Sequence, residues 1–148
     1  MFARRRLLFV LALLVVFLAG CGGAPVSDLE DKREINMIVD TYLNAVFNGD
    51  YNTAKGCLHP DSPLQERLDM IFQQFAPIFA DLHSSGYTLV ADLDLLNINI
   101  SGDTAVATVG TANFCYYHNI YDMDCEQNND LYGSQIMFKK YAGKWYVY

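Results

Sequence analysis

The sequence predicts an α+β domain in which helices come first and a curved, mostly antiparallel sheet follows. Before Tyr87, apolar residues recur every three or four positions, which is the spacing of an amphipathic helix. From Tyr87 onward the spacing changes to two, as in strands that bury one face. Helices followed by a run of strands, rather than helices alternating with strands, is the element order of the α+β class.

The first twenty residues are predicted to be an export signal that is removed from the mature protein. Arg4–Arg6 precede an uncharged, apolar run from Leu7 to Ala19, which is the charge and hydrophobicity pattern of a signal peptide. A helix of these 13 residues would span about 20 Å, less than the roughly 30 Å hydrocarbon core of a bilayer. A permanent membrane-spanning anchor is therefore the poorer interpretation.

The segment Leu18-Ala19-Gly20-Cys21 resembles the lipobox of bacterial lipoproteins. The resemblance implies that Cys21 receives a diacylglyceryl group and becomes the N-terminus after cleavage. Residues 21–27 then form the lipidated cysteine and a short tether, and residues 28–148 form the domain. We expect a lipid-anchored protein on the outer face of the cell membrane, or on an outer membrane where the host has one.

The mature chain is strongly acidic. Without the three signal arginines it has 7 basic and 17 acidic residues, a formal charge of −10. Such a surface repels phosphate backbones, so nucleic acid is excluded as the expected partner. It is not attracted to anionic lipid head groups either, so membrane attachment depends on the lipid.

Three cysteines follow Cys21, at positions 57, 115 and 125. Disulfides persist outside the cytoplasm, and we expect Cys115 and Cys125 to form one between two strands, with Cys57 as a buried, inert thiol. A nucleophilic Cys57 activated by His59 is the alternative, but closeness in sequence does not bring the two side chains together. The thiols also lack the paired spacing of a zinc site.

Two helices are predicted before residue 60. The first begins with the capping box Ser27-x-x-Glu30 and ends at Asn48-Gly49, where glycine allows a left-handed stop. Asp50 is expected to cap a short second helix that ends near Leu58, because the residue before Pro60 is driven out of the helical region.

A third helix is predicted from Ser62-Pro63 to Gly86. A capping residue followed by proline is typical of a helix start, and Gln65 completes a second capping box. Pro77 lies inside the apolar stripe of this helix and is expected to kink or split it.

Two long strands are predicted after the helices. In the first, which begins at Tyr87, the apolar positions slip from Leu95 to Leu96, Ile98 and Ile100, which predicts a bulge at Leu95–Leu96. After a turn at residues 101–103, the second strand runs from residue 104 to about 119, with a bulge or bend at Gly110.

The chain is expected to end in a polar loop and a hairpin. Residues 122–130 are read as the loop, and residues 131–141 and 144–148 as strands joined across Ala142-Gly143. The loop carries oxygen-bearing side chains at alternate positions, as calcium loops do. The EF-hand pattern fails, however, at Gln127 and Gly133, so we expect no metal and no other cofactor.

Two segments of the chain resemble the nuclear transport factor 2-like superfamily. They are the helix–Gly-Asp–helix opening around Asn48-Gly49-Asp50-Tyr51 and the closing hairpin around Gly143-Lys144-Trp145. The chain is especially similar to small bacterial lipoproteins that carry an uncharacterised domain of this type. The resemblance covers roughly residues 29–148 and implies a cone-shaped α+β fold. The superfamily includes isomerases, dehydratases, cyclases and binding modules, so the fold alone assigns no activity.

The residues favour binding over catalysis. In the fold that the resemblance implies, aromatic side chains could line an apolar cavity between sheet and helices. The expected pocket residues are Tyr42, Phe72, Phe75, Tyr116, His118, Tyr132 and Trp145. We expect a non-catalytic domain that binds a small apolar ligand or an envelope protein. The alternatives are a cavity enzyme that uses Asp92, Asp94 or His118, and a structural homodimer formed through the sheet face.

Overall fold

The computed structural model describes residues 26–119 and 122–148. Residues 1–30 and 31–148 form separate units, and the first is described only at Val26–Glu30, so the fold concerns residues 31–148. The predicted export signal and Cys21 lie outside the described residues. Within the described ranges, no helix is both long and apolar enough to cross a membrane.

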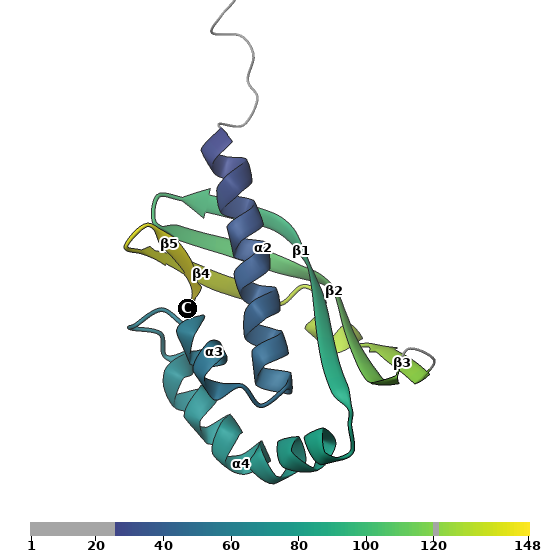
Figure 1. Cartoon of the computed structure of the whole chain (residues 1–148). Coiled ribbons are helices and arrows are strands. Elements are labelled where there is room, and N and C mark those ends of the chain that lie inside the picture. The colour runs from purple at the N-terminus through teal and green to yellow at the C-terminus, as the bar shows by residue number, and fades with distance from the viewer. Residues whose placement is uncertain (1–25, 120–121) are drawn as a thin grey trace, which may run out of the picture. The chain divides into compact units, whose positions relative to one another are not determined.

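Among the described residues, three helices precede the sheet: α2 (Val26–Phe47), α3 (Tyr51–Gly56) and α4 (Leu64–Ser84) (Figure 1). Gly49 takes the left-handed φ of +71° after α2, and the side chain of Asp50 accepts a hydrogen bond from the Thr53 N–H to cap α3, both as predicted. The predicted cap at Ser27 is wrong, because α2 already includes Val26 and Ser27 therefore lies inside its first turn.

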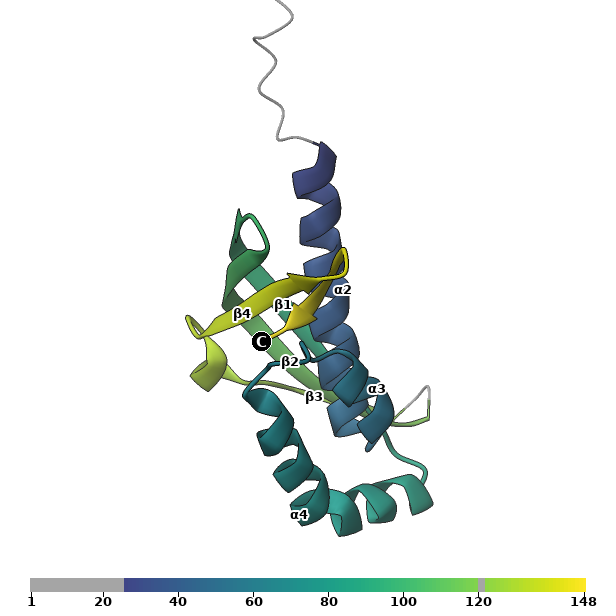
Figure 2. The same ribbon diagram turned by 90° about the vertical axis from the view of Figure 1, so that its left-hand side faces the viewer.

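Helix α4 is kinked rather than split. It is continuous around Pro77, and its ribbon changes direction midway in both Figure 1 and Figure 2. Proline removes one backbone donor and its ring crowds the preceding turn, which explains the bend. At the start of α4, Ser62 Oγ accepts from the Leu64 N–H at 3.2 Å, while the Gln65 amide donates to the carbonyl of His59 at 3.0 Å.

The sheet contains β1 (Thr88–Ser101), β2 (Thr104–Asn119), β3 (Asp122–Gln127), β4 (Gln135–Tyr141) and β5 (Lys144–Val147). All of these strands pair antiparallel, in the order β1-β2-β4-β5, with β3 also paired to β2. Strand β2 is long enough to pair with β4 near its start and with β3 near its end. The α+β class with a curved, open antiparallel sheet is therefore confirmed.

Two bulges interrupt the β1–β2 pairing. Gly110 and Thr111 of β2 together oppose Asp94, which confirms the irregularity predicted at Gly110. A Cβ at Gly110 would lie 2.8 Å from Leu96 Cγ, so only glycine fits there without movement. The bulge predicted at Leu95–Leu96 is displaced: Leu95 stays buried, Leu96 is 39% exposed, and the slip follows at Asn97, whose φ is +51°.

The polar segment predicted as a loop at residues 122–130 is mostly strand. Residues Asp122–Gln127 form β3, and the short 3₁₀ helix η1 (Asn129–Leu131) follows. Because η1 and a turn at Gly133 occupy the next residues, β4 begins at Gln135 rather than at Leu131. The turn at Ala142-Gly143 has positive φ at both residues, as a two-residue hairpin requires.

The core lies between the helices and one face of the sheet. Its largest fully buried side chains are Trp145, Phe138, Ile35, Leu68 and Val39. Helix α2 is fixed to the β4–β5 hairpin through Asp31, which accepts hydrogen bonds from Lys140 Nζ at 2.8 Å and from Trp145 Nε1 at 2.9 Å.

Helix α2 also contacts the outer edge of β1 through an amide ladder, formed by Asn44 and Asn48. Asn48 exchanges two hydrogen bonds with the backbone of Leu89, at 2.7 and 3.2 Å, and Asn44 exchanges two with Ala91, at 2.9 and 3.0 Å. Four helical residues rise about 6 Å and two strand residues about 6.6 Å, so the two spacings match. The ladder thus replaces a neighbouring strand.

Candidate functional site

A cavity of about 470 Å³ lies where the end of α2 meets β1, β2 and β3. Its apolar lining is Phe47, Leu89, Val90, Phe114 and Tyr116. The chain from Glu126 to Asp130 supplies its polar lining. A hollow with an aromatic wall and a polar rim is the usual form of a small-molecule site.

The aromatic wall follows from the length and alternation of β2. Phe114 pairs with Ala91, and Tyr116 pairs with Leu89, so both rings point to the same face of the sheet as the buried side chains of β1. Phe47 at the end of α2 meets Phe114 edge-on, with ring centroids 5.0 Å apart. Tyr116 lies farther along β2 and is 41% exposed. The wall therefore runs from a packed interior to an open mouth.

Strand β3 lies beside β2 in the sheet, extends the cavity wall on the same face, and is joined to β2 by a disulfide. Cys115 and Cys125 are direct cross-strand partners, with Cα atoms 4.1 Å apart. The neighbouring pairs place Glu126 beside Phe114 and Asp124 beside Tyr116. Both carboxylates thus lie on the same face of the sheet as the aromatic rings.

A second hollow, of about 360 Å³, adjoins the first. It is lined by Leu82 of α4 together with Tyr87, Tyr116 and Asp124. Tyr116 therefore lines both hollows, and a ligand that fills one of them would touch this ring.

Of the seven predicted pocket residues, Tyr116 lines the cavity and the others lie elsewhere. Tyr42 is half-buried against the core, and burial, followed by the influence of Cys57, raises the pKa of its hydroxyl. Phe72 lines a separate, open hollow beside Tyr51 and Asp69. Phe75 is exposed next to Phe79.

The other three predicted residues are also absent from the cavity lining. The His118 ring packs on Tyr87, with centroids 5.0 Å apart, and Tyr132 is 70% exposed. Trp145 is fully buried at the hydrogen bond to Asp31. The sequence did not lead us to expect Phe47, Leu89 and Phe114 in the cavity lining. Their places in the apolar pattern of the helix and the strands were the one signal that it contained.

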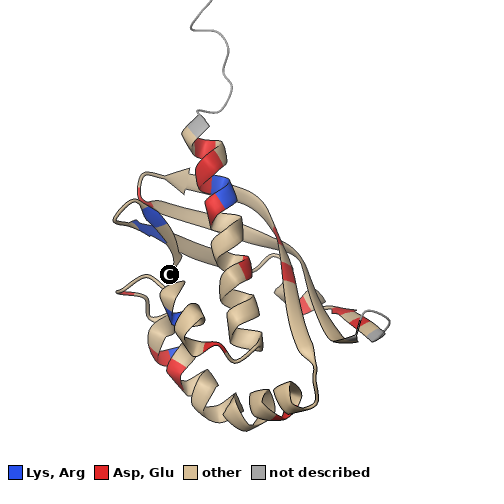
Figure 3. Ribbon diagram, viewed as in Figure 1, with Lys and Arg blue, Asp and Glu red and all other residues tan. Residues whose placement is uncertain are grey.

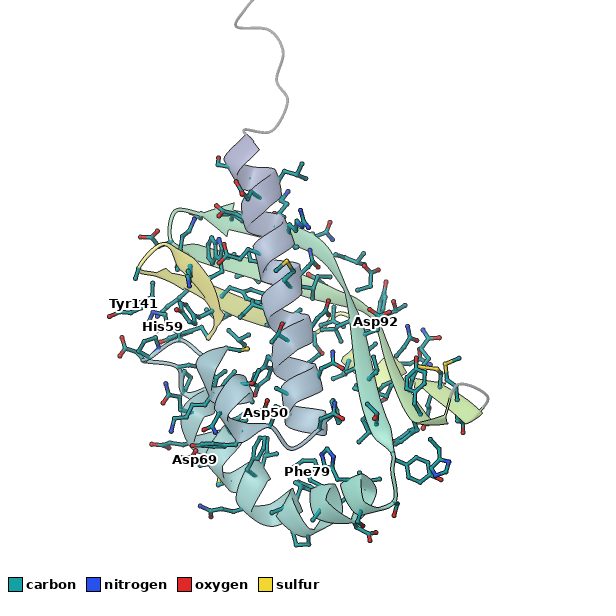
Figure 4. The ribbon with its side chains drawn as sticks, viewed as in Figure 1. Asp50, His59, Asp69, Phe79, Asp92 and Tyr141 are labelled. Carbon is teal, nitrogen blue, oxygen red and sulfur yellow. A yellow bond between two sulfur atoms is a disulfide. The ribbon has the colours of Figure 1, made fainter. Side chains whose placement is uncertain are left out.

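The residues weighed for catalysis are not assembled into one site. Burial, followed by the charge of Asp50, raises the pKa of the Cys57 thiol, which is opposite to what a nucleophile needs. His59 accepts from the Asp61 N–H at 3.1 Å, and its ring packs edge-on against Tyr141 beside the C-terminal hairpin (Figure 4). Asp92 is exposed on β1 (Figure 4).

Asp94 is exposed on β1 as well. No group of three or more His, Cys, Asp or Glu side chains is placed to hold a metal ion within residues 26–119 and 122–148. The acidic residues of the segment 122–130 are spread along the sequence of β3 and η1.

By sequence, no protein-family model and no curated protein matches the chain. Solved structures are similar in fold. A Mycobacterium tuberculosis protein of unknown function is 14% identical, with a TM-score of 0.55 over 86% of this chain and 73% of that one. An NTF2-like protein with a cystatin-like fold from Novosphingobium aromaticivorans is 16% identical, with a TM-score of 0.54 over 84% of this chain and 81% of that one.

Proposed function

We propose that this domain, which has the nuclear transport factor 2-like fold, binds a small ligand with an apolar body in the cavity between α2, β1, β2 and β3. The observation that carries the proposal is the aromatic wall formed by Phe47, Phe114 and Tyr116 around about 470 Å³. Ligand sites commonly enclose about 300–1,000 Å³ and combine apolar walls with a few polar groups. The cavity has both properties.

The polar rim of the cavity, residues 126–130, is suited to hydrogen bonding with a ligand. Asn128 is held in place because its side chain accepts from the Asp130 N–H at 2.9 Å and its N–H donates to Ala112 at 2.8 Å. The rim is thereby attached to β2, which also carries Phe114 and Tyr116. A ligand in the cavity would meet a wall and a rim that move together.

The first test replaces the ring that lines both hollows. We expect 4-phenylbutan-1-ol to bind saturably, and Tyr116→Ala to weaken it about fivefold or more, since an aromatic contact contributes roughly 1 kcal/mol. Tyr132→Ala removes an equally large but 70% exposed ring and should leave the affinity unchanged. Isothermal titration calorimetry gives the affinities, and amide NMR shifts locate the probe.

Two results would contradict this function. One is the absence of saturable binding by the unmodified domain. The other is an equal loss of affinity in Tyr116→Ala and Tyr132→Ala, which would place the probe outside the cavity.

We also propose that the domain is held outside the cytoplasmic membrane by a lipid on Cys21. The support is the lipobox resemblance of residues 18–21, and one diacylglyceryl group with a further acyl chain anchors a protein stably. In a bacterial host, the full chain should incorporate labelled palmitate and sediment with membranes, whereas Cys21→Ser should do neither. Cys57→Ala is the control and should still be labelled; labelling of Cys21→Ser would refute the anchor.

A further inference from the structure

We infer that the ligand of the cavity is an organic cation: a protonated amine or quaternary ammonium group carried on an apolar or aromatic body. The inference rests on the proposed function and adds the charge of the ligand to it. Three observations support it: the charged side chains that line the cavity, the excess of acidic residues in the strands around it, and the orientation of the aromatic wall.

The charged side chains that line the two hollows are all acidic. Glu126 and Asp130 line the larger hollow, and Asp124 lines the smaller one, whereas neither lining contains lysine, arginine or histidine. Within the part of the chain that the structure describes, the one ion pair joins Asp31 to Lys140, away from this site. A cationic group would therefore meet carboxylates that are not already neutralised.

The same bias extends over the strands that build the cavity. No lysine or arginine occurs between Arg67 and Lys139, although that segment contains nine acidic residues. Figure 3 shows how these residues are distributed along the ribbon: basic residues occur on the helices and on the β4–β5 hairpin, whereas the charged residues of β1 and β3 are acidic. The field at the cavity mouth thus attracts cations and repels anions.

The aromatic wall is suited to the same ligand. Phe47 meets Phe114 edge-on, so the two rings are not stacked face to face on each other. Tyr116 is 41% exposed beside Asp124 and Glu126 of the neighbouring strand. Aromatic faces attract ammonium groups through the ring quadrupole, and carboxylates nearby strengthen the attraction. The apolar body would fill the hollow while the charged end lies at the acidic rim.

The test uses three probes with one body and different charges: 4-phenylbutylammonium, 4-phenylbutan-1-ol and 4-phenylbutanoate. At pH 7 and low ionic strength, the ammonium probe should bind about fivefold tighter than the alcohol, and the carboxylate should bind weakest. Raising the salt concentration should lower the affinity for the ammonium probe and leave the affinity for the alcohol unchanged, because salt screens the charges.

A matched pair of variants locates the charge effect. Glu126→Gln should lower the affinity for the ammonium probe about threefold while leaving the affinity for the alcohol unchanged. Glu66→Gln removes one charge from the exposed first turn of α4, which lines neither hollow. This variant should bind both probes with unchanged affinity. Equal losses in the two variants would show a general charge effect and overturn the inference.

The outcomes separate this inference from the proposed function. If the alcohol binds as tightly as the ammonium probe, and Tyr116→Ala weakens both, the cavity binds ligands but has no preference for cations. If none of the three probes binds saturably, both the proposed function and the inference are wrong.

Discussion

Asp40 lies at the next position of the amide ladder on α2, where an asparagine would continue the pattern of Asn44 and Asn48. Asp40, Asn44 and Asn48 are spaced by four residues, and they face Leu93, Ala91 and Leu89 of β1 in turn. A carboxylate can accept from a backbone N–H but cannot donate to the carbonyl. Asp40 Oδ1 is accordingly buried with no hydrogen-bond partner among the described residues.

The contribution of Asp40 to the stability of the fold should depend on pH. Burial, and then the charge of Asp92, raises the pKa of Asp40, while the Leu93 N–H partly offsets the rise. Since the folded-state pKa lies above the unfolded one, the contribution of Asp40 to stability is complete below the unfolded pKa. It is lost as the pH rises through the folded pKa.

Asp40→Asn should therefore increase the free energy of unfolding at pH 7 by about 1 kcal/mol, because an amide can both accept and donate. The gain should shrink as the pH falls toward 4, where the native carboxyl is increasingly protonated. Urea titrations of both proteins at several pH values measure this. Asn44→Asp makes the reverse change and should lose about 1–3 kcal/mol; a gain in Asp40→Asn that does not vary with pH would contradict the explanation.

At the scale of elements, β3 is the part of the site that sequence patterns did not reveal. Its residues Asp122–Gln127 are mostly polar and lack the β-branched and aromatic side chains that favour strands. The segment becomes a strand because β2 extends past β4 and offers its free edge, and because Cys115 and Cys125 are joined across the pair. These are tertiary causes, which local composition does not contain.

The disulfide should matter for the cavity as well as for stability. Reduction should lower the free energy of unfolding by up to about 2–3 kcal/mol, the chain-entropy value for a short loop. It should also weaken 4-phenylbutan-1-ol binding, because β3 carries part of the cavity lining. The double variant Cys115→Ala/Cys125→Ala should behave like the reduced protein and be insensitive to reductant. Unchanged affinity after reduction would show that β3 holds its position without the bond.

At the scale of the whole molecule, features with a local physical cause were predicted well. The stop at Gly49, the cap at Asp50, the kink at Pro77 and the turn at Ala142-Gly143 each follow from one or two residues. The change of hydrophobic period at Tyr87 was enough to give the fold class. The cavity was harder to predict, because α2, β1, β2 and β3 meet there from distant parts of the chain.

The expected pocket included Trp145 because large aromatics can line ligand sites. The structure instead buries Trp145 in the core, hydrogen-bonded to Asp31. Phe114 lines the cavity because it lies near the end of β2, beyond the region that β4 covers. The residue at which β2 extends past β4 depends on the assembled sheet. Residue type alone therefore could not show that Phe114 lines the cavity and that Trp145 lies in the core.

The contact between α2 and β1 has a consequence for solubility at high local concentration. An open strand edge is a template on which a second chain can add a strand and begin to aggregate. The amide ladder occupies that edge at Leu89 and Ala91, and Val147 of β5 is hydrogen-bonded to Cys57 and His59. The outer edge of β3 is short and acidic, which disfavours addition of a strand by charge repulsion. Copies crowded together on a surface would therefore find the β1 edge at Leu89 and Ala91 and the end of β5 already hydrogen-bonded within their own chain.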